Sequence, residues 1–217
     1  MVSVMHKLMS PFSVRSTRFL HQPLGGRSRA MLVAAAGLIF VVYFLPLWNL
    51  TMFAPQYPHG LRLDIYQHGF VGGHNGQDVK EINVLNHYIG MRDLVTEDFT
   101  EFNWMPFVLG GVGLLFLRAA VLGTVKEMVD SIVVLGYIGT FSLWSFGYRL
   151  YRYGHDLAPS APVNVDPFMP PMFGYQKIAN FEVYSYPRIG TYLLLAAVVL
   201  VLASLFMAWR QRKQHGN

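Results

Sequence analysis

Four long apolar stretches constrain this chain more than any other feature of its sequence. They occupy residues 30–48, 105–123, 131–148 and 191–209, and the only charged residue in them is Arg118. As helices rising about 1.5 Å per residue, stretches of this length cover roughly 28 Å, close to the hydrocarbon thickness of a bilayer. Because a segment inside a membrane must satisfy its own backbone hydrogen bonds, the sequence predicts four membrane-spanning helices.

Composition points in the same direction. Of the 217 residues, 53% are hydrophobic and 13% are charged, which is too apolar for an ordinary soluble domain. The predicted fold class is an α-helical integral membrane protein, with four transmembrane helices and a small mixed α/β extracytoplasmic cap built from two long loops. The predicted segments are a basic N-terminal segment (1–29), spans at 30–48, 105–123, 131–148 and 191–209, outer loops at 49–104 and 149–190, a short inner connection (124–130) and a tail (210–217).

Lysine and arginine predict the orientation of these segments. Residues 1–29 carry five basic residues and no acid, and residues 210–217 carry three basic residues and no acid. Loop 49–104 carries three basic residues against seven acidic ones. The excess of cations marks the cytoplasmic side, so we expect both termini in the cytoplasm of a bacterium and both long loops in the periplasm. The net charge of +5 then reflects contact with membrane lipid rather than with nucleic acid.

Cysteine is absent from the chain. No disulfide can hold the outer loops together, and any soft-metal site must use histidine and methionine. The predicted spans contain no histidine and the chain has no CxxCH motif, so haem is not expected. Nucleotide-binding motifs and a nucleophile elbow are also missing. We therefore do not expect an enzyme.

The outer loops contain patterns of regular structure. Residues 61–67 (LRLDIYQ) and 180–186 (NFEVYSY) alternate apolar and polar side chains, which predicts two strands, most economically paired with each other. Residues 78–90 (DVKEINVLNHYIG) predict a helix that Asp78 caps together with Glu81 and that Gly90 ends. Its predicted buried stripe consists of Ile82, Leu85 and Ile89.

Histidine and methionine on the outer side form the candidate metal site. Imidazole and thioether groups are the ligands that a periplasmic copper(I) site uses when thiolate is absent. His87 and Met91 are the first-choice ligands, and His59 and His155 are possible completions from other segments. The alternative is structural, with the His87 ring hydrogen-bonded inside the cap and His155 fixing its loop.

Three stretches resemble a known group of bacterial membrane proteins. These are "APQYPHGL" (54–61), "EINVLNHYIGM" (81–91) and "YGHDLAPSAP" (153–162), in this order. The group is associated with gene clusters for copper handling and nitrous oxide reductase maturation, so the resemblance implies an accessory or metal-delivery role. The "MPPM" stretch (169–172) departs from the group's pattern. The residues that match its signature are Tyr57, Pro58, Asn86, His87, Met91 and His155.

Two functions follow from the sequence. In the first, an inner-membrane accessory protein binds copper in its periplasmic cap or delivers it to a periplasmic copper enzyme. In the second, the chain is a non-catalytic structural subunit or scaffold of a membrane complex, without a metal of its own. A membrane or periplasmic protein partner is expected in both cases, and the oligomeric state is open. A permease is least favoured, because few polar groups line the predicted spans.

Overall fold

The computed structural model describes residues 19–178 and 180–215. These residues divide into two compact units. We call residues 19–40, 110–137 and 195–215 the helical unit, and residues 41–109 and 138–194 the sheet unit. The predicted N-terminal segment lies largely outside the described residues, which begin at 19.

Among the described residues, three helices are long and apolar enough to cross a membrane, by length and composition. They are α5 (Glu101–Leu122), α6 (Val125–His155) and α7 (Ile189–His215). Helix α3 (Gly26–Val42) comes before them in the chain. Gly123, in the turn between α5 and α6, has a positive φ of 65°.

The prediction of a four-span helical membrane protein is wrong. Helix α3 has 17 residues, a rise of about 26 Å, which is short of the roughly 30 Å hydrocarbon core. The apolar run at 30–48 is shared between two structures: the helix ends at Val42, and a strand begins at Trp48. Pro46 lies between them, and it has no backbone N–H to donate to a continued helix. The fold instead combines helices with a five-stranded antiparallel sheet.

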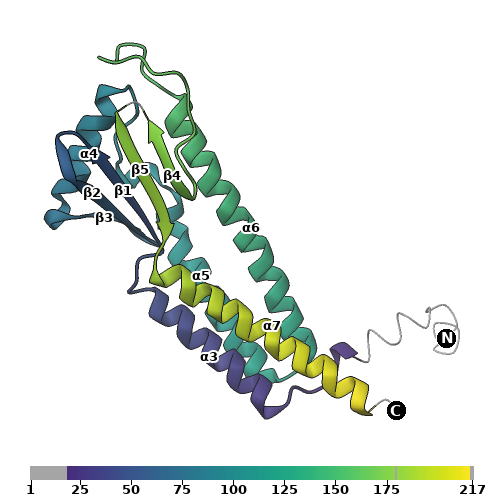
Figure 1. The fold of residues 1–217 in the computed structure, drawn as a ribbon. Helices are drawn as coiled ribbons and strands as arrows, with labels where there is room; N and C mark the ends of the chain where they lie inside the picture. Colours follow the sequence, from purple (N-terminus) through teal and green to yellow (C-terminus); the bar gives the residue numbers. More distant parts are fainter. Residues whose placement is uncertain (1–18, 179, 216–217) are drawn as a thin grey trace, which may run out of the picture. The chain divides into compact units, whose positions relative to one another are not determined.

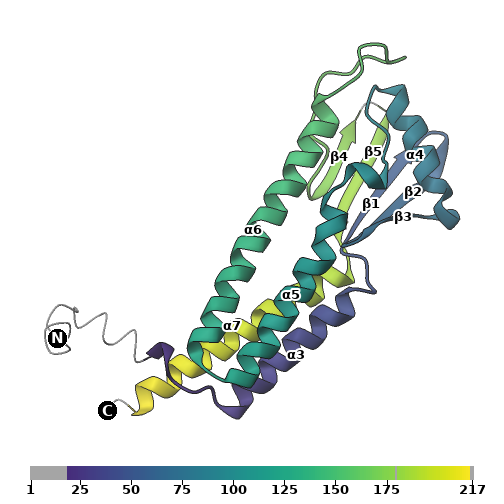
Figure 2. The same ribbon diagram turned by 180° about the vertical axis from the view of Figure 1, so that it is seen from behind.

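Small polar side chains join α3 to α7 within the helical unit. The Ser28 hydroxyl donates to the carbonyl oxygen of Ser204 (3.5 Å), and the Ser204 hydroxyl lies 3.4 Å from the carbonyl oxygen of Ser28 and 3.2 Å from the Met128 sulfur. All three side chains are buried. Small residues at such a contact let two helices approach closely, and Figures 1 and 2 show α3 and α7 side by side.

The sheet runs in the order β3-β2-β1-β5-β4, with every neighbouring pair antiparallel. The two predicted strands are confirmed, as parts of β2 and β5. Their predicted pairing is wrong, because β1 lies between them and pairs with both. The strands are β1 (Trp48–Ala54), β2 (Tyr57–Tyr66), β3 (Gly69–Gly72), β4 (Gly174–Ile178) and β5 (Phe181–Pro187).

Helix α4 (Gln77–Tyr88) covers one face of the sheet, as Figures 1 and 2 show. The predicted buried stripe is confirmed, because Ile82, Leu85 and Ile89 are buried with Leu61 and other inward residues of the strands. Because successive side chains of a strand point to opposite faces of the sheet, polar and aromatic side chains occupy the other face.

The predicted cap of α4 is wrong. Gly76 occupies the N-cap position with a φ of 88°, and no side chain caps the helix. The Asp78 carboxylate instead accepts the backbone N–H of Arg62 at 2.8 Å, while its other oxygen lies 2.7 Å from Nδ1 of His74. Asp78 therefore joins α4 to β2, and it does so as a buried carboxylate.

Candidate functional site on the sheet unit

Two of the four candidate metal ligands lie on the surface. His87 is exposed on α4, so its ring is neither buried nor turned into a concave polar site. His59 is exposed on β2. Among the described residues, no three histidines or acids gather where they could hold a metal ion, so His59, His87 and His155 do not converge on one site.

The other two candidates have contacts of their own. Met91 is half-buried, packs against the core of the sheet unit and lines a cavity of about 40 Å³ together with Met52 and Asn86. His155 is the last residue of α6, its ring stacks on Tyr151 with centroids 3.8 Å apart, and its Nδ1 lies 2.9 Å from the Tyr151 carbonyl oxygen. Met91 also borders an open depression lined by Asp156, the residue after His155.

The asparagines of "INVLNHYIGM" clamp the chain that follows α4. The side chain of Asn83 accepts the backbone N–H of Leu94 at 2.7 Å and donates to the Leu94 carbonyl at 3.2 Å. The buried Asn86 donates to the carbonyl of Arg92 at 3.4 Å. Gly90 makes the reversal possible with a φ of 80°. The motif therefore builds a fixed helix–turn corner, a role that the sequence pattern did not identify.

Three members of the same motif point away from this corner. Val84 and Tyr88 are 61% and 51% exposed, and His87 is exposed beside them. Their spacing of three and four residues places them together along one side of α4. We call Val84, His87 and Tyr88 the outer side of α4.

Tyr57 and Glu81 join the start of β2 to α4. The Tyr57 hydroxyl donates to one oxygen of the Glu81 carboxylate, and Gln77 donates to the other at 3.2 Å. The bond from Tyr57 lowers the pKa of Glu81, with Gln77 adding to the effect. The same bond, with burial and the nearby negative charge, raises the pKa of Tyr57. The hydrogen bond thus favours the ionised form of Glu81 and the protonated form of Tyr57.

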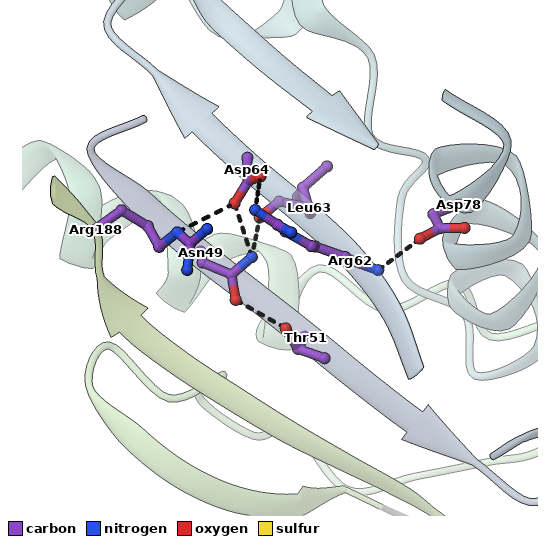
Figure 3. A network of polar contacts seen from close by, with 7 residues as sticks. All are labelled: Asn49, Thr51, Arg62, Leu63, Asp64, Asp78 and Arg188. Atoms are coloured by element: carbon purple, nitrogen blue, oxygen red, sulfur yellow. Dashed lines mark hydrogen bonds and ion pairs between the residues drawn. The ribbon is translucent and has the colours of Figure 1, made fainter. Parts of the chain in front are cut away.

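A charged network occupies the uncovered face of the sheet. The Asp64 carboxylate accepts hydrogen bonds from Asn49 at 2.9 Å and from Arg62 at 2.5 Å, and the Nε of Arg188 lies 3.7 Å away. Figure 3 shows these three side chains turned toward Asp64, and Thr51 donating to the Asn49 oxygen. The network joins β1, β2 and the residue that precedes α7.

Aromatic rings continue this face across β5 and β4. The Tyr175 and Tyr184 rings are 5.0 Å apart, and Phe53 meets Tyr184 edge-on at 5.6 Å. Phe173 and Tyr186 form a second edge-on pair at 5.4 Å. Burial and the neighbouring Glu182 carboxylate raise the pKa of Tyr184, and its hydroxyl donates to that carboxylate at 3.3 Å.

Sequence reasoning missed the network of Asn49, Asp64 and Arg188. These residues are distant in sequence, and only the registers of β1 against β2 and β5 bring them together. A partial signal was present, because Arg62 and Asp64 alternate with buried leucines on one strand. Comparisons of this chain with protein-family models, curated proteins and solved structures gave no match.

Proposed function

We propose that this chain is a non-catalytic accessory subunit of a bacterial membrane complex, held in the membrane by α5, α6 and α7. Its sheet unit docks a partner protein through the outer side of α4. The observation that carries the proposal is the exposure of Val84, His87 and Tyr88 on the last turns of α4, where Ile82 and Leu85 hold the core and Asn83 and Asn86 clamp the following chain.

The apolar helices and the charge distribution support the proposed location. Three helices have the length and composition of membrane spans. Residues 210–217 carry three basic residues and no acid, whereas residues 49–104 carry seven acidic residues and three basic ones. This bias of lysine and arginine supports a C-terminal segment in the cytoplasm and a sheet in the periplasm of a bacterial inner membrane.

The outer side of α4 has the properties of a protein-docking surface. It combines exposed apolar area with an aromatic ring, a combination that is enriched where proteins bind each other. The clamps from Asn83 and Asn86 hold the corner that ends the helix, so little conformational freedom is lost when a partner binds.

A photo-crosslinking residue at Tyr88 tests the docking surface. Tyr88 and Tyr175 are 51% and 50% exposed, on α4 and on the opposite face of the sheet. In membranes of the native host, we expect the probe at Tyr88 to give one discrete crosslinked product and the probe at Tyr175 to give none of that mass. Equal products from both positions, or none from Tyr88, would contradict docking through α4.

Copper delivery is the second candidate function. It is favoured by the exposed His87 imidazole, which a partner carrying further soft ligands can approach. Among the described residues, the three predicted histidines do not gather into one group, so His87 would supply one ligand of a site shared with the partner. His59 and His155 do not join His87 in a group of three among the described residues, and Met91 stays a predicted ligand.

Replacing His87 tests copper delivery. We expect His87→Ala to lower the copper retained per mole of purified protein, while His68→Ala, an exposed histidine outside the motif, leaves it unchanged. Elemental analysis of the protein after loading with copper(I) gives this ratio. An unchanged ratio in His87→Ala would remove the copper role and leave the docking role in place.

A further inference from the structure

The charged network lies at the end of the sheet where α7 follows β5 in the chain. Asn49 is the second residue of β1, and Arg188 directly precedes Ile189, the first residue of α7. The backbone N–H of Arg188 donates to the carbonyl of Leu47 at 2.8 Å, so the end of β5 and the start of β1 are held together.

This position corresponds to the headgroup layer of a bilayer crossed by α7. Asn49 lies two residues along the chain from Leu47, a rise of about 7 Å in extended backbone. The polar layer on each side of the hydrocarbon core is roughly 5–8 Å thick. The network is therefore at the depth of lipid phosphates when the apolar part of α7 fills the core.

The two arginines keep hydrogen-bonding capacity that Asp64 does not use. Their side chains are 48% exposed for Arg62 and 43% exposed for Arg188, whereas the Asp64 side chain is 14% exposed. A guanidinium group carries five N–H donors, and one carboxylate engages only some of those on two arginines. With two cations and one anion the cluster is net positive, and the planar fork of arginine matches phosphate oxygens.

Exposed aromatic rings surround the network at the same end of the sheet. Tyr186 pairs with Asn49 across the strands and is 43% exposed. Phe173, edge-on to Tyr186, is 67% exposed, and Tyr192 in the first turn of α7 is 54% exposed. Aromatic side chains gather at the boundary between lipid and water. They indicate the depth of this end of the sheet independently of the arginines.

We propose that Arg62 and Arg188, held in place by Asp64 and Asn49, bind the phosphate of a phospholipid headgroup. The inference rests on the proposed membrane anchoring by α5, α6 and α7. The lipid's acyl chains lie along the exposed apolar start of α7, where Ile189 is 51% exposed. A free phosphate ion has the same headgroup chemistry without this apolar contact.

Thermal unfolding of the full chain in a mild non-ionic detergent measures this binding. Phosphatidylglycerol added to the micelles raises Tm by mass action if it binds the folded state. We expect diacylglycerol, which has the same chains without the phosphate, and inorganic phosphate to leave Tm unchanged. Inorganic phosphate that stabilises as well as the lipid would show a site for a free anion and overturn the lipid assignment.

Two substitutions locate the site. In Arg188→Gln and in Arg62→Gln, we expect the lipid fraction needed for half the Tm shift to rise by about tenfold or more, as for the loss of a charged hydrogen bond. Arg152→Gln is the matched control, because Arg152 is also 43% exposed and paired with an acid, Asp156. A shift retained in both network variants, or lost equally in Arg152→Gln, would overturn the proposal.

Two further measurements keep folding and anchoring separate from binding. Arg188→Lys preserves the charge and loses the planar fork, so we expect a weaker lipid response than in the unmodified chain at an unchanged Tm without lipid. Alkaline carbonate extraction of native membranes tests the anchoring itself. Release of the chain by carbonate contradicts both proposals, whereas retention without an arginine-dependent lipid response contradicts only the headgroup site.

Discussion

The buried stripe and the polar positions of "INVLNHYIGM" differ in how far the sequence reveals them. Ile82, Leu85 and Ile89 follow the helical period, so their burial could be predicted from spacing. The partners of Asn83 and Asn86 are backbone groups of residues 92–94, beyond the end of the helix. Their roles depend on where the chain turns at Gly90, which periodicity does not describe. His87 is exposed. Neither alternative considered from the sequence, a ligand in a shared metal site or a ring hydrogen-bonded inside the cap, described this position.

The hydrogen bond between Tyr57 and Glu81 makes stability depend on pH at both ends of the scale. The lowered pKa of Glu81 contributes stability above the carboxyl's unfolded pKa, and this contribution is lost as pH falls through the folded pKa. The raised pKa of Tyr57 contributes stability below the phenol's unfolded pKa of about 10, and this contribution is lost as pH rises through the folded value.

We therefore expect the Tm difference between the unmodified chain and Tyr57→Phe to be largest between roughly pH 5 and 9. It should shrink in acid below about pH 4 and in alkali above about pH 10. Thermal unfolding in detergent across this range measures the difference. A difference that does not vary with pH would assign the effect of the substitution to packing rather than to the hydrogen bond.

At the scale of elements, strands were predictable where one face is buried and the other is not. Residues 61–67 alternate clearly, and β2 and β5 were found for that reason. Strand β1, which lies between them, was missed because Trp48 and Leu50 follow directly on an apolar stretch whose length and composition predict a helix. Alternation also does not specify a strand's neighbour, so the pairing could not be predicted before β1 was known.

Gly90 sets the corner between α4 and the following chain, and alanine there should destabilise the sheet unit. Its φ of 80° costs an L-residue about 1–2 kcal/mol. An added Cβ would also lie 2.8 Å from the Ala158 carbonyl oxygen. Gly76→Ala is the control, because Gly76 has a φ of 88° and no atom within 4 Å of its Cβ position. We expect a larger loss of Tm for Gly90→Ala, and equal losses would show that contact with Ala158 is unimportant.

For the whole molecule, composition predicted long apolar helices correctly wherever an apolar run belongs to one element. It failed at residues 30–48, where a run of that length contains a helix end, a proline and a strand start. The candidate surface was predictable only in part. His87 could be chosen from its motif. The Asp64 network depends on strand register, which the sequence does not specify. The outer side of α4 depends on which helix positions bond to the chain that follows.

Alkaline phosphatase fusions test the proposed orientation, because this enzyme needs disulfides that form outside the cytoplasm. We expect an active fusion when the reporter is inserted after Ser160, an exposed residue of the loop after α6. A fusion after Asn217 should be inactive, since residues 210–217 carry the basic residues of a cytoplasmic segment. Activity at Asn217, or its absence at Ser160, would reverse the orientation drawn from lysine and arginine.

The two strands that enter and leave the sheet at its helix end, β1 and β5, are hydrogen-bonded to each other over their length. Tension applied through the preceding and following chain is thus received by the centre of the sheet, while β3 and β4 lie at its edges. Pulling apart residues 47 and 188 would open the ladder from Trp48 and Pro187 one pair at a time. Pulling residues 47 and 188 together, with the far end of the sheet held, would share the force between β1 and β5. We therefore expect the β1–β5 ladder to resist little force when residues 47 and 188 are separated and more force when both are pulled together, a directional response that single-molecule force measurements can resolve.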